Sequence, residues 1–357
     1  MKLLFITRTY PPIVGGMEKF SHDFYENYRR KGEIDLLANA GGKAMLPYFF
    51  IKAAIYLMFN SKNYDVIHFG DAVLAPLNAV VRLFSRARVS VTVHGLDIVY
   101  SRFGYQRIIL PSLRKVDRVF AVSHFTLEQC KLRGVSSEKL MVIPNSISFE
   151  FPGSFSQSDI SEKISKFGIT VQGRTILLTV GRLVKRKGHG WFIANVLRLL
   201  PENFIYVIAG FGPEYEAIRE TVLDLGLENR VYLLGHVTED EKQCLYQISD
   251  LFIMPNISVK NDQEGFGIVL LEAGQHGLPV IASKIEGIRD AVIEQKTGRL
   301  IEEKDVQGFI DAILKPDIDR TSLVDVVASY FDWKHIIEMY HEEFEKMKAR
   351  NPGDLQA

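Results

Sequence analysis

Short apolar runs alternate with longer helix-patterned stretches along the whole chain, and this alternation restricts the fold more than any other feature. The apolar residues within each run are contiguous, as expected for strands that are covered on both faces. In the first half the runs lie at residues 2–7, 65–70, 89–95, 118–123 and 139–145. The stretch 18–30, between the first two runs, has the pattern of a helix. Strands joined in this way by helices form parallel sheets.

The pattern restarts after a polar segment at 148–164 that is rich in Ser, Gly and Pro, and we expect this segment to be a linker. The second set of runs lies at 175–182, 204–210, 230–235, 251–256, 278–283 and 298–302. We therefore predict an α/β protein with two doubly wound, Rossmann-like domains, at 1–152 and 165–328. Ligands of such sheets bind beyond the carboxyl ends of the strands, so two facing sheets are expected to share one cleft.

Composition excludes some classes of function. The 357 residues contain 43 Lys and Arg and 43 Asp and Glu, and this balance argues against a general nucleic-acid binding protein. Cys130 and Cys244 lie far apart, without the spacing of a metal site, so we expect reduced thiols in a cytoplasmic protein. The N-terminal apolar run is too short for a signal peptide.

Unusual residues follow the ends of the predicted strands. The turn TYPPIVGG ends with Gly15 and Gly16, which let a ligand approach the backbone at the start of a helix. The turn GRLVKRKG carries Arg182 and Lys187 just before another helix, and this arrangement suits a diphosphate. The common position of these turns, at strand ends in both halves, favours a ligand site over plain turn geometry.

Two glutamates, Glu264 and Glu272, stand at the ends of the otherwise apolar segment EGFGIVLLE. The turn AGFGPE, with Gly210 and Gly212, follows an earlier strand. The segments GRLVKRKG, AGFGPE and EGFGIVLLEAGQHGLPVIAS, in this order, resemble the retaining glycosyltransferases of the GT-B fold, in particular family four, the glycosyl transferases group 1. This resemblance implies two Rossmann-like domains that face each other across a cleft.

The remainder of the chain resembles the same family more loosely. PPIVGG, VTVHGLD, VFAVS and VIPNSI resemble its first domain, although Ser146 stands where the family usually has glycine. The segment YFDWKHIIEMYHEEFEKM resembles its last helices, which cross back, so we expect a helix at 330–350 to join the first domain. The segment between the first helix and DVIHFG is short for this family, which leaves the acceptor undefined.

The resemblance assigns roles to the two glutamates and the residues between them. Glu264 is expected at the donor sugar and its phosphates, and Glu272 at the ribose hydroxyls, since a carboxylate accepts two hydroxyl hydrogen bonds. The alternative for Glu272 is a solvated helix residue. The backbone amides of Gly265, Phe266 and Gly267 are expected to face the diphosphate.

Cations complete the implied donor site. Arg182 and Lys187 are expected to neutralise the diphosphate as the glycosidic bond breaks. The family generally needs no metal for this step, so we expect no metal and no cofactor. Gly16, Gly210 and Gly212 are expected to border the donor.

Four further residues are assigned with alternatives. His94 is expected to contact the donor sugar as a catalytic residue, or else to be a packed or capping histidine. Asp97 and Gly15 are expected on the acceptor side, although an N-capping role explains Asp97 equally well. His236 either lines the base pocket or caps a helix.

Three functions remain open at this point. The first is a retaining hexosyl or similar transferase, which moves a sugar from a nucleotide diphosphate sugar, most simply a UDP-sugar, to a saccharide or lipid-linked acceptor in cell-surface polysaccharide or glycolipid synthesis. The second is a non-catalytic nucleotide-sugar binding subunit. The third is another GT-B enzyme such as a sugar-nucleotide epimerase, which does not share the EGFGIVLLE segment. Donor-dependent product formation separates the first from the second.

One apolar stretch, 45–60, is too short for a spanning helix and is interrupted by Lys52. It is either a helix packed in the first domain or an interfacial element that enters the headgroup region of a membrane. Basic residues dominate the region 82–118, where the only acids are Asp97 and Asp117. We therefore expect an anionic membrane surface as a further partner, and peripheral association with the inner face of the membrane.

Overall fold

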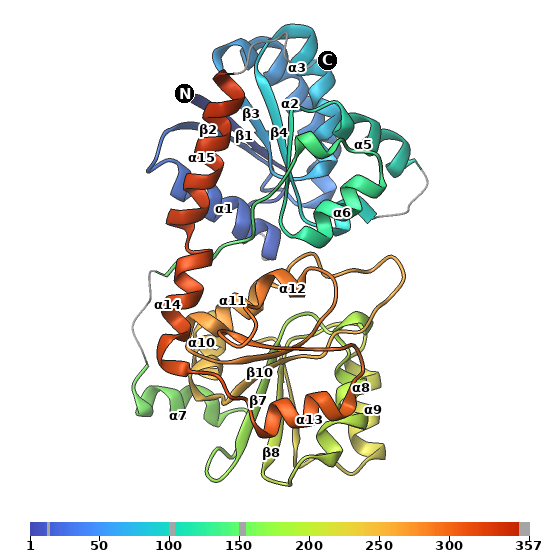
Figure 1. The fold of residues 1–357 in the computed structure, drawn as a ribbon, viewed down its shortest axis with the longest axis vertical. Helices are drawn as coiled ribbons and strands as arrows, with labels where there is room; N and C mark the ends of the chain where they lie inside the picture. Colours follow the sequence, from blue (N-terminus) through green and yellow to red (C-terminus); the bar gives the residue numbers. More distant parts are fainter. Residues whose placement is uncertain (13–14, 100–103, 150–154, 350–357) are drawn as a thin grey trace. The chain divides into compact units, whose positions relative to one another are not determined.

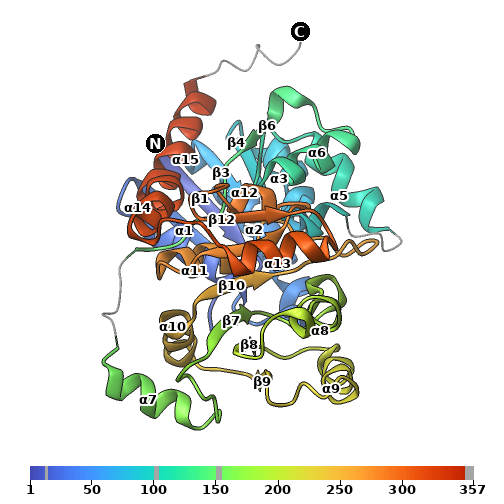
Figure 2. The same cartoon turned by 60° about the horizontal axis from the view of Figure 1, so that its bottom comes forward.

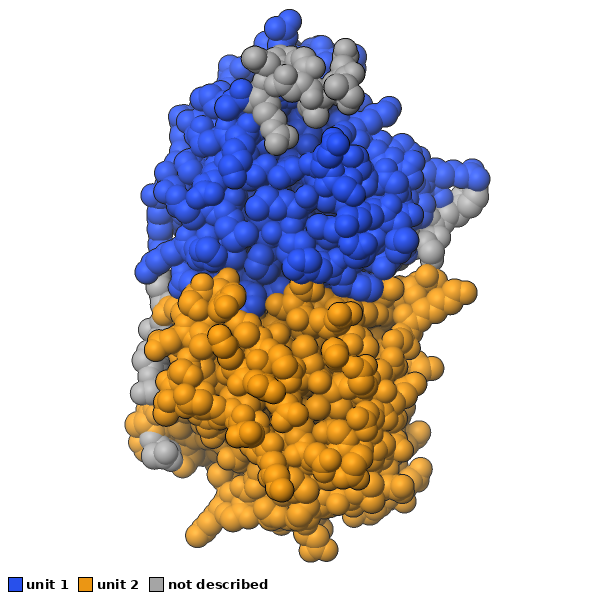
Figure 3. Space-filling model, viewed as in Figure 1, with its two compact units in different colours: residues 1–148, 264–266, 331–357 blue, residues 149–263, 267–330 orange. Residues whose placement is uncertain are grey.

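The structure, a computed structural model, describes residues 1–12, 15–99, 104–149 and 155–349 (Figure 1). The chain divides into two compact units (Figure 3). Unit 1 comprises Met1–Ser148, Glu264–Phe266 and Phe331–Ala357, and unit 2 comprises Phe149–Gln263 and Gly267–Tyr330.

The described part of unit 1 holds a parallel six-stranded sheet with the order β2-β1-β3-β4-β5-β6 (Figure 1). Its strands are β1 (Lys2–Thr7), β2 (Glu33–Ala38), β3 (Val66–Phe69), β4 (Arg88–Val93), β5 (Arg118–Ala121) and β6 (Leu140–Val142). Five of them lie within the predicted runs. The sixth, β2, was not predicted because its sequence EIDLLA mixes charged and apolar residues, as an edge strand can.

Helices cover both faces of this sheet. They are α1 (Gly16–Tyr28), α2 (Leu46–Asn60), α3 (Asn78–Phe84), α4 (Leu96–Val99), α5 (Tyr105–Arg114), α6 (His124–Leu132) and α15 (Trp333–Ala349). Short 3₁₀ turns lie at η1 (Lys43–Met45), η2 (Ser61–Asn63), η3 (Ala72–Leu77) and η4 (Ser137–Lys139). The strand order reverses between β1 and β3, which makes the sheet doubly wound.

Each face of the sheet has its own core. On one face, α2, η3, α3 and α5 pack over side chains such as Ile67, Val89 and Val91. On the other face, α1 and α15 cover an aromatic layer, which includes Phe120 and Phe344. The last helix is therefore part of unit 1, as expected for the fold.

The loop after β6 is tied to the start of this last segment. Ser146 is buried, and its hydroxyl donates to the carbonyl oxygen of Phe331 at 2.6 Å. The N–H of Ile147 donates to the same carbonyl at 3.1 Å. The serine that departs from the family's usual glycine therefore fixes the chain entering α15.

The described part of unit 2 holds a second parallel six-stranded sheet, with the order β12-β11-β10-β7-β8-β9. Its strands are β7 (Thr175–Val180), β8 (Phe204–Ala209), β9 (Val231–Gly235), β10 (Leu251–Met254), β11 (Val280–Ser283) and β12 (Gly298–Ile301). The surrounding helices are α7 (Gln157–Ser165), α8 (His189–Asn195), α9 (Tyr215–Asp224), α10 (Glu239–Ile248), α11 (Ile268–Gln275), α12 (Ile288–Ala291), α13 (Val306–Leu314) and α14 (Arg320–Phe331). The turns η5 (Lys185–Lys187) and η6 (Leu197–Leu199) flank α8. Two doubly wound α/β sheets confirm the predicted fold class.

Helix α7 lies inside the segment that was expected to be a linker. Ser156 caps it by accepting from the N–H of Asp159, and the Asp159 carboxylate accepts in return from the N–H of Ser156. Ile160 and Ile164 pack against Cys244 of α10, which lies beside α7 (Figure 2). Packing and capping thus make a helix out of a polar stretch. The units divide the chain after Ser148 and after Tyr330, with Glu264–Phe266 in unit 1. The expected domains at 1–152 and 165–328 stay a prediction.

Phe344 provides a test of how much α15 stabilises unit 1. Its buried ring lies against Tyr28, Phe120 and Tyr340, at centroid distances of 5.8, 5.7 and 5.9 Å. We expect Phe344→Ala to lower the free energy of unfolding by about 3–5 kcal/mol, measured by urea denaturation. The exposed Leu132 is the control, because Leu132→Ala removes no core contact. Equal, small effects of both changes would contradict a core role for α15.

Candidate functional site

In unit 2, the loops after β7 and β8 lie directly on each other at the carboxyl edge of the sheet. The N–H of Gly181 donates to Ala209 O at 2.9 Å, and the N–H of Leu183 to Phe211 O at 3.2 Å. A Cβ at Gly210 would lie 1.8 Å from Gly181 O, with φ at +153°. Both predicted turns are therefore one structural unit, and any side chain at Gly210 would push them apart.

Gly212 continues the same contact. A Cβ there would lie 2.2 Å from the carbonyl oxygen of Leu183. Gly210 and Gly212 were predicted to border the donor, and the structure adds that they hold the cation-bearing loop in place. Their contact with a donor stays a prediction.

The two predicted cations of that loop differ in exposure. Arg182 is exposed, whereas Lys187 in η5 is only 8% exposed. The neighbouring Arg186 pairs with Asp262 at 3.6 Å, and Lys185 is exposed. The Lys187 side chain is therefore part of the packed structure. Its substitution is expected to lower the free energy of unfolding as well as the stabilisation of a bound diphosphate.

Beneath Lys187 lies a buried histidine. His189 is the first residue of α8, and its Nδ1 lies 3.0 Å from the hydroxyl oxygen of Tyr206. Burial, together with the charge of Lys187, lowers the pKa of His189 to about 3. The ring is therefore neutral at pH 7, which leaves the positive charge of this loop on its arginine and lysine side chains.

An aromatic surface follows β8 and β9. Phe211 is about half exposed, and its ring lies 5.7 Å from the ring of His236 and 5.1 Å from that of Tyr215. His236 was predicted to line a base pocket or cap a helix. The structure places its exposed ring on Phe211, and a planar base has room to stack on such a surface. Phe211 was not predicted because the sequence analysis used only the glycines of its turn.

Glu272 lies in α11 and is only 8% exposed, so it is not a solvated helix residue. Its Oε2 accepts from Lys242 Nζ at 3.2 Å and from the hydroxyl of Tyr246 at 3.1 Å. Burial and the Glu272 carboxylate raise the pKa of Tyr246 well above its usual value. The phenol therefore stays protonated and acts as a donor to Glu272.

Lys242 and Tyr246 were missed by the sequence analysis. Both lie on α10, 30 and 26 residues before Glu272, and no spacing connects them to it. Lys242 also pairs with Glu239 at 3.0 Å. The His276 ring, on the other side, stacks on Tyr246 at 5.1 Å. Glu272 is thus a buried, charge-compensated acceptor at a fixed position.

The first glutamate of the pair lies in unit 1. Gly265 lies so close to the turn after β4 that a Cβ on it would be 1.9 Å from His94 O. Glu264, next to it, is half-buried. The structure therefore sets the backbone that follows Glu264 against the backbone of His94.

Phe266 and Gly267 complete this segment. The Phe266 side chain is buried against the ring of Phe331, 6.0 Å away, so a contact with a donor would come from its backbone. Gly267, with φ at +95°, is the N-cap of α11. The amides of this segment stand at the start of a helix, where an anion is favoured.

His94 is held by three contacts. Its Nε2 lies 2.9 Å from Gly70 O, so this nitrogen carries the hydrogen, and Nδ1 carries the lone pair in the neutral ring. Its backbone N–H donates to Asp97 Oδ1 at 2.9 Å, and Phe20 packs edge-on at 4.8 Å. The ring is therefore fixed in orientation.

Asp97 holds the turns around His94. It is buried, and besides His94 it accepts from the N–H of Ala72 at 3.1 Å. Burial raises the pKa of Asp97. Close by, Arg8 pairs with the buried Asp71 at 2.9 Å, and this pair was not predicted. Asp97 thus joins β4 to η3, while its acceptor role stays a prediction.

The start of α1 carries the remaining predicted residues. Gly15 is its N-cap and Gly16 its first residue, and both are exposed. A Cβ at Gly16 would meet no atom within 4 Å, so there is room for a ligand. The carboxylate of Glu18 already lies beside Gly15, 2.3 Å from the position of a Cβ. An acidic ligand would therefore meet a like charge at Gly15.

Among the described residues, no three His, Cys, Asp or Glu side chains gather as a metal site. The prediction that the protein needs no metal stays a prediction.

Family models match both halves of the chain. The model of Glycosyltransferase Family 4 matches residues 14–151, and that of Glycosyl transferases group 1 matches residues 160–318. The chain belongs to the GT-B glycosyltransferases.

Two curated relatives span most of this glycosyltransferase. The GDP-mannose-dependent alpha-(1-6)-phosphatidylinositol monomannoside mannosyltransferase of Mycobacterium tuberculosis is 25% identical, over 93% of each chain. The UDP-Gal:alpha-D-GlcNAc-diphosphoundecaprenol alpha-1,3-galactosyltransferase of Escherichia coli is 26% identical, over 75% of this chain and 70% of its own. Anabaena Alr3699/HepE, solved with UDP, has the same fold, with a TM-score of 0.78 and 22% identity over 97% of this chain and 100% of its own.

The buried His189 predicts a pH dependence of stability. Because its folded-state pKa is about 3, well below the usual 6.5, only the unfolded chain binds its proton between those values. The free energy of unfolding therefore falls as pH drops below 6.5. We expect His189→Gln to make this fall shallower by about 1.4 kcal/mol per pH unit near pH 5, measured by urea denaturation.

Phe192→Leu, a volume change in the same core, serves as control and should leave the slope as in the wild type. If the free energy of unfolding of His189→Gln varied with pH as it does in the wild type, His189 would not be the cause of this pH dependence.

Proposed function

We propose that this glycosyltransferase is a retaining enzyme that transfers a hexosyl or similar group from a UDP-sugar to a lipid-linked saccharide acceptor. The observations that carry the proposal are Arg182 and Lys187 in the loop at the carboxyl edge after β7, and a buried, charge-compensated Glu272 in α11, the helix that follows β10. Such an edge is where open α/β sheets bind ligands. The two cations suit the diphosphate of a nucleotide diphosphate, and the Glu272 carboxylate suits the two hydroxyls of its ribose.

Arg182 and the amides of Gly265–Gly267 are each proposed to bind the diphosphate. Arg182 presents a planar guanidinium that forms bidentate hydrogen bonds with phosphate oxygens. Lys187 adds a second charge, whose long stem is buried. Together they replace a divalent cation in stabilising the leaving group.

The nucleoside is proposed to lie over the aromatic surface of Phe211 and His236, with its ribose at Glu272. Ribose hydroxyls donate to the Glu272 carboxylate, which keeps Lys242 as its counter-charge. Because Lys242 and Tyr246 already fix this carboxylate, it needs little reorganisation when the ribose binds.

The transfer follows from these contacts. The bond between the anomeric carbon and the diphosphate oxygen breaks, and its electron pair stays on the diphosphate beside Arg182 and Lys187. The acceptor hydroxyl oxygen bonds to the anomeric carbon on the same face, and its proton passes to the departing phosphate oxygen. His94 and Glu264 are proposed to hold the sugar hydroxyls; the contact of Gly265, the residue after Glu264, with the carbonyl of His94 supports this assignment.

The acceptor is proposed from the relatives. The mycobacterial enzyme acts on a phosphatidylinositol mannoside and the Escherichia coli enzyme on a diphosphoundecaprenol-linked sugar, according to their names. We propose a lipid-linked acceptor for this chain, with Gly15 and Asp97 on the acceptor side. This places the enzyme in cell-surface polysaccharide or glycolipid synthesis, at the cytoplasmic face of a membrane. Among the described residues no helix is long and apolar enough to cross a membrane.

Removal of the guanidinium of Arg182 tests the diphosphate assignment. We expect Arg182→Ala to lower kcat roughly 100-fold, about 3 kcal/mol of transition-state stabilisation, as for other charge-stabilising donors. Lys185→Ala is the matched control, because Lys185 is an exposed cation three residues away in the same loop. Steady-state transfer assays measure both. Wild-type turnover in Arg182→Ala would refute the assignment.

The linkage formed by the enzyme tests the proposed function as a whole. A panel of UDP- and GDP-sugars is incubated with the protein and lipid-linked saccharide acceptors, and the anomeric proton of the product is examined by NMR. We expect an α-linked product from an α-linked donor. A β-linked product would exclude retention, and nucleotide-sugar binding without any product would favour a non-catalytic subunit.

A further inference from the structure

Helix α2 exposes an apolar stripe to solvent. The outward side chains Tyr48, Ile51, Ile55 and Phe59 are 62, 62, 51 and 77% exposed. They recur every three to four residues, so they lie on one side of the helix. The opposite side, with Phe49, Ala53 and Leu57, packs into the core. The packed-helix alternative for residues 45–60 therefore holds for one side of the helix, while the other side is exposed to solvent.

The stripe extends onto a neighbouring helix. Helix α3 packs beside α2 and ends with Leu83 and Phe84, which are 78 and 36% exposed. The solvent-facing side of a helix normally carries charged or polar residues. A cluster of exposed apolar side chains on that side indicates an interaction surface.

Cations predominate around this apolar surface. Between residues 36 and 116 the sequence contains three carboxylates, Asp65, Asp71 and Asp97. Asp71 and Asp97 are buried, and Asp65 pairs with Lys348 at 3.3 Å. Outside this range, Asp35 accepts from the hydroxyl of Tyr64, and Asp117 pairs with Arg82 of α3. The exposed cations Lys52 of α2, Lys62 of η2 and Arg86 of the α3–β4 connection therefore make the surface positive.

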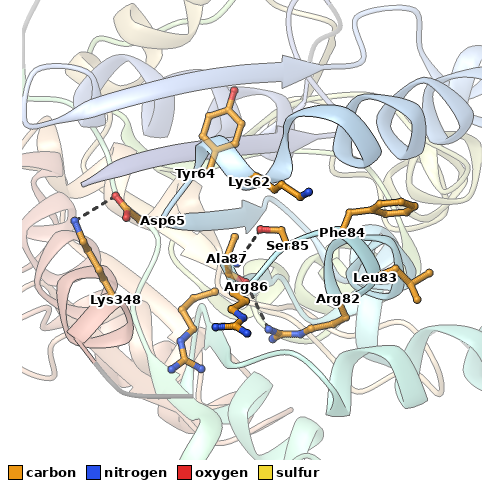
Figure 4. Close-up of a pocket in the computed structure, with 11 residues that line it drawn as sticks. Lys62, Tyr64, Asp65, Arg82, Leu83, Phe84, Ser85, Arg86, Ala87 and Lys348 are labelled. Atoms are coloured by element: carbon orange, nitrogen blue, oxygen red, sulfur yellow. Dashed lines mark hydrogen bonds and ion pairs between the residues drawn. The ribbon is translucent and has the colours of Figure 1, made fainter. Parts of the chain in front are cut away.

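A pocket of about 720 Å³ lies at the end of α3, and Asp65, paired with Lys348, is part of its lining (Figure 4). Leu83 and Phe84 contribute apolar lining from the end of α3. The cationic lining consists of Lys62, Arg82, Arg86, Arg88 and Lys348.

The cations of this pocket are of two kinds. Asp117 holds Arg82 and, at 3.6 Å, Arg88. Lys62 and Arg86 have no carboxylate within ion-pair distance in the described part of the chain. The pocket therefore combines two fixed guanidinium groups with two cations that are available to a ligand.

We propose that the α2–α3 surface docks on an anionic lipid bilayer, with the apolar stripe in the headgroup region and a lipid phosphate in the pocket at Arg86. An apolar helix side next to Lys52, Lys62 and Arg86 is complementary to an anionic interface, which offers both an apolar layer and phosphate charge. The lipid phosphate has the charge and the oxygen acceptors that Lys62 and Arg86 lack among the described residues.

A second copy of the chain fits this surface less well. A two-fold contact would bring Lys52, Lys62 and Arg86 against the same residues of the other copy, and like charges would repel each other. The membrane avoids this repulsion because its phosphates carry the opposite charge.

The direction of α2 connects this surface to the site of transfer. In the β2–α2–β3 unit the helix runs opposite to the strands, so it begins near their carboxyl edge and ends near the pocket at their amino edge. Its 15 residues span about 22 Å. A bilayer lying along α2 therefore reaches the carboxyl edge of this sheet, where Gly15 and His94 stand.

Vesicle sedimentation tests the proposal with the full chain and does not depend on catalysis. The protein is mixed with phosphatidylglycerol-containing or pure phosphatidylcholine vesicles at low and high salt. We expect binding to the anionic vesicles only, with release at high salt. Each basic residue near such a surface strengthens binding roughly fivefold, so Lys62→Glu with Arg86→Glu should weaken it about 25-fold or more.

Ile51→Ser with Phe59→Ser should weaken binding roughly tenfold or more at any salt concentration, since burial of apolar area is not screened. The charge-keeping pair Lys62→Arg and Arg86→Lys should bind as the wild type does. Arg198→Glu and Leu199→Ser are the matched controls, because both residues are exposed in η6 of unit 2. Circular dichroism and thermal unfolding confirm that each variant is folded.

Three results would overturn the proposal. The first is equal binding to both vesicle types, including no binding to either. The second is unweakened binding by the folded charge-reversal or serine variants. The third is a dimer in sedimentation velocity that the serine variants dissociate, because the stripe would then be an interface between copies.

Discussion

Backbone-on-backbone contact at the carboxyl edge of the second sheet is the constraint on which the candidate donor site depends. The loop after β8 touches the loop after β7 through Gly210 and Gly212, with no side chain between them. Two amide–carbonyl bonds hold the loops together, so the exposed Arg182 and the buried Lys187 share a fixed backbone. A flexible backbone would let the two cations separate, and a fixed one keeps both charges directed at one place before any ligand arrives.

A cation and a hydrogen-bond donor nearby allow the Glu272 carboxylate to be buried. Glu272 is almost inaccessible, and an isolated charge there would be strongly destabilising. Lys242 and the phenol of Tyr246 supply the missing contacts from another helix, and the neutral His189 adds no further positive charge to the loop that contains Lys187. Similarly, Asp97 takes two backbone N–H groups around His94. Contacts of this kind come from residues behind those that touch a ligand, and they fix the orientation of the ligand-binding side chains.

Most of the fold follows from the sequence because strands covered on both faces need contiguous apolar runs. Eleven of the twelve strands in the described residues lie in such runs, and β2 was missed because an edge strand tolerates Glu33 and Asp35. Helix α7 was missed because its capping box and its contact with Cys244 outweigh a polar composition. In the site, residues at strand ends were found. Lys242, Tyr246, Phe211 and the Arg8–Asp71 pair were not, since only tertiary packing brings them to their partners.

The position of α15 in the sequence has a consequence for synthesis of the chain. One face of the first sheet is covered by α1 and by α15, yet residues 149–330, most of them in unit 2, are translated between β6 and that helix. At ordinary elongation rates of roughly 5–20 residues per second, this takes on the order of ten seconds or more. During that time Phe24, Phe120 and their neighbours lack the cover of Tyr340 and Phe344. The nascent protein therefore exposes an aromatic surface that chaperones on the ribosome can bind. Unit 2 can also finish folding before unit 1, although most of unit 1 is translated first.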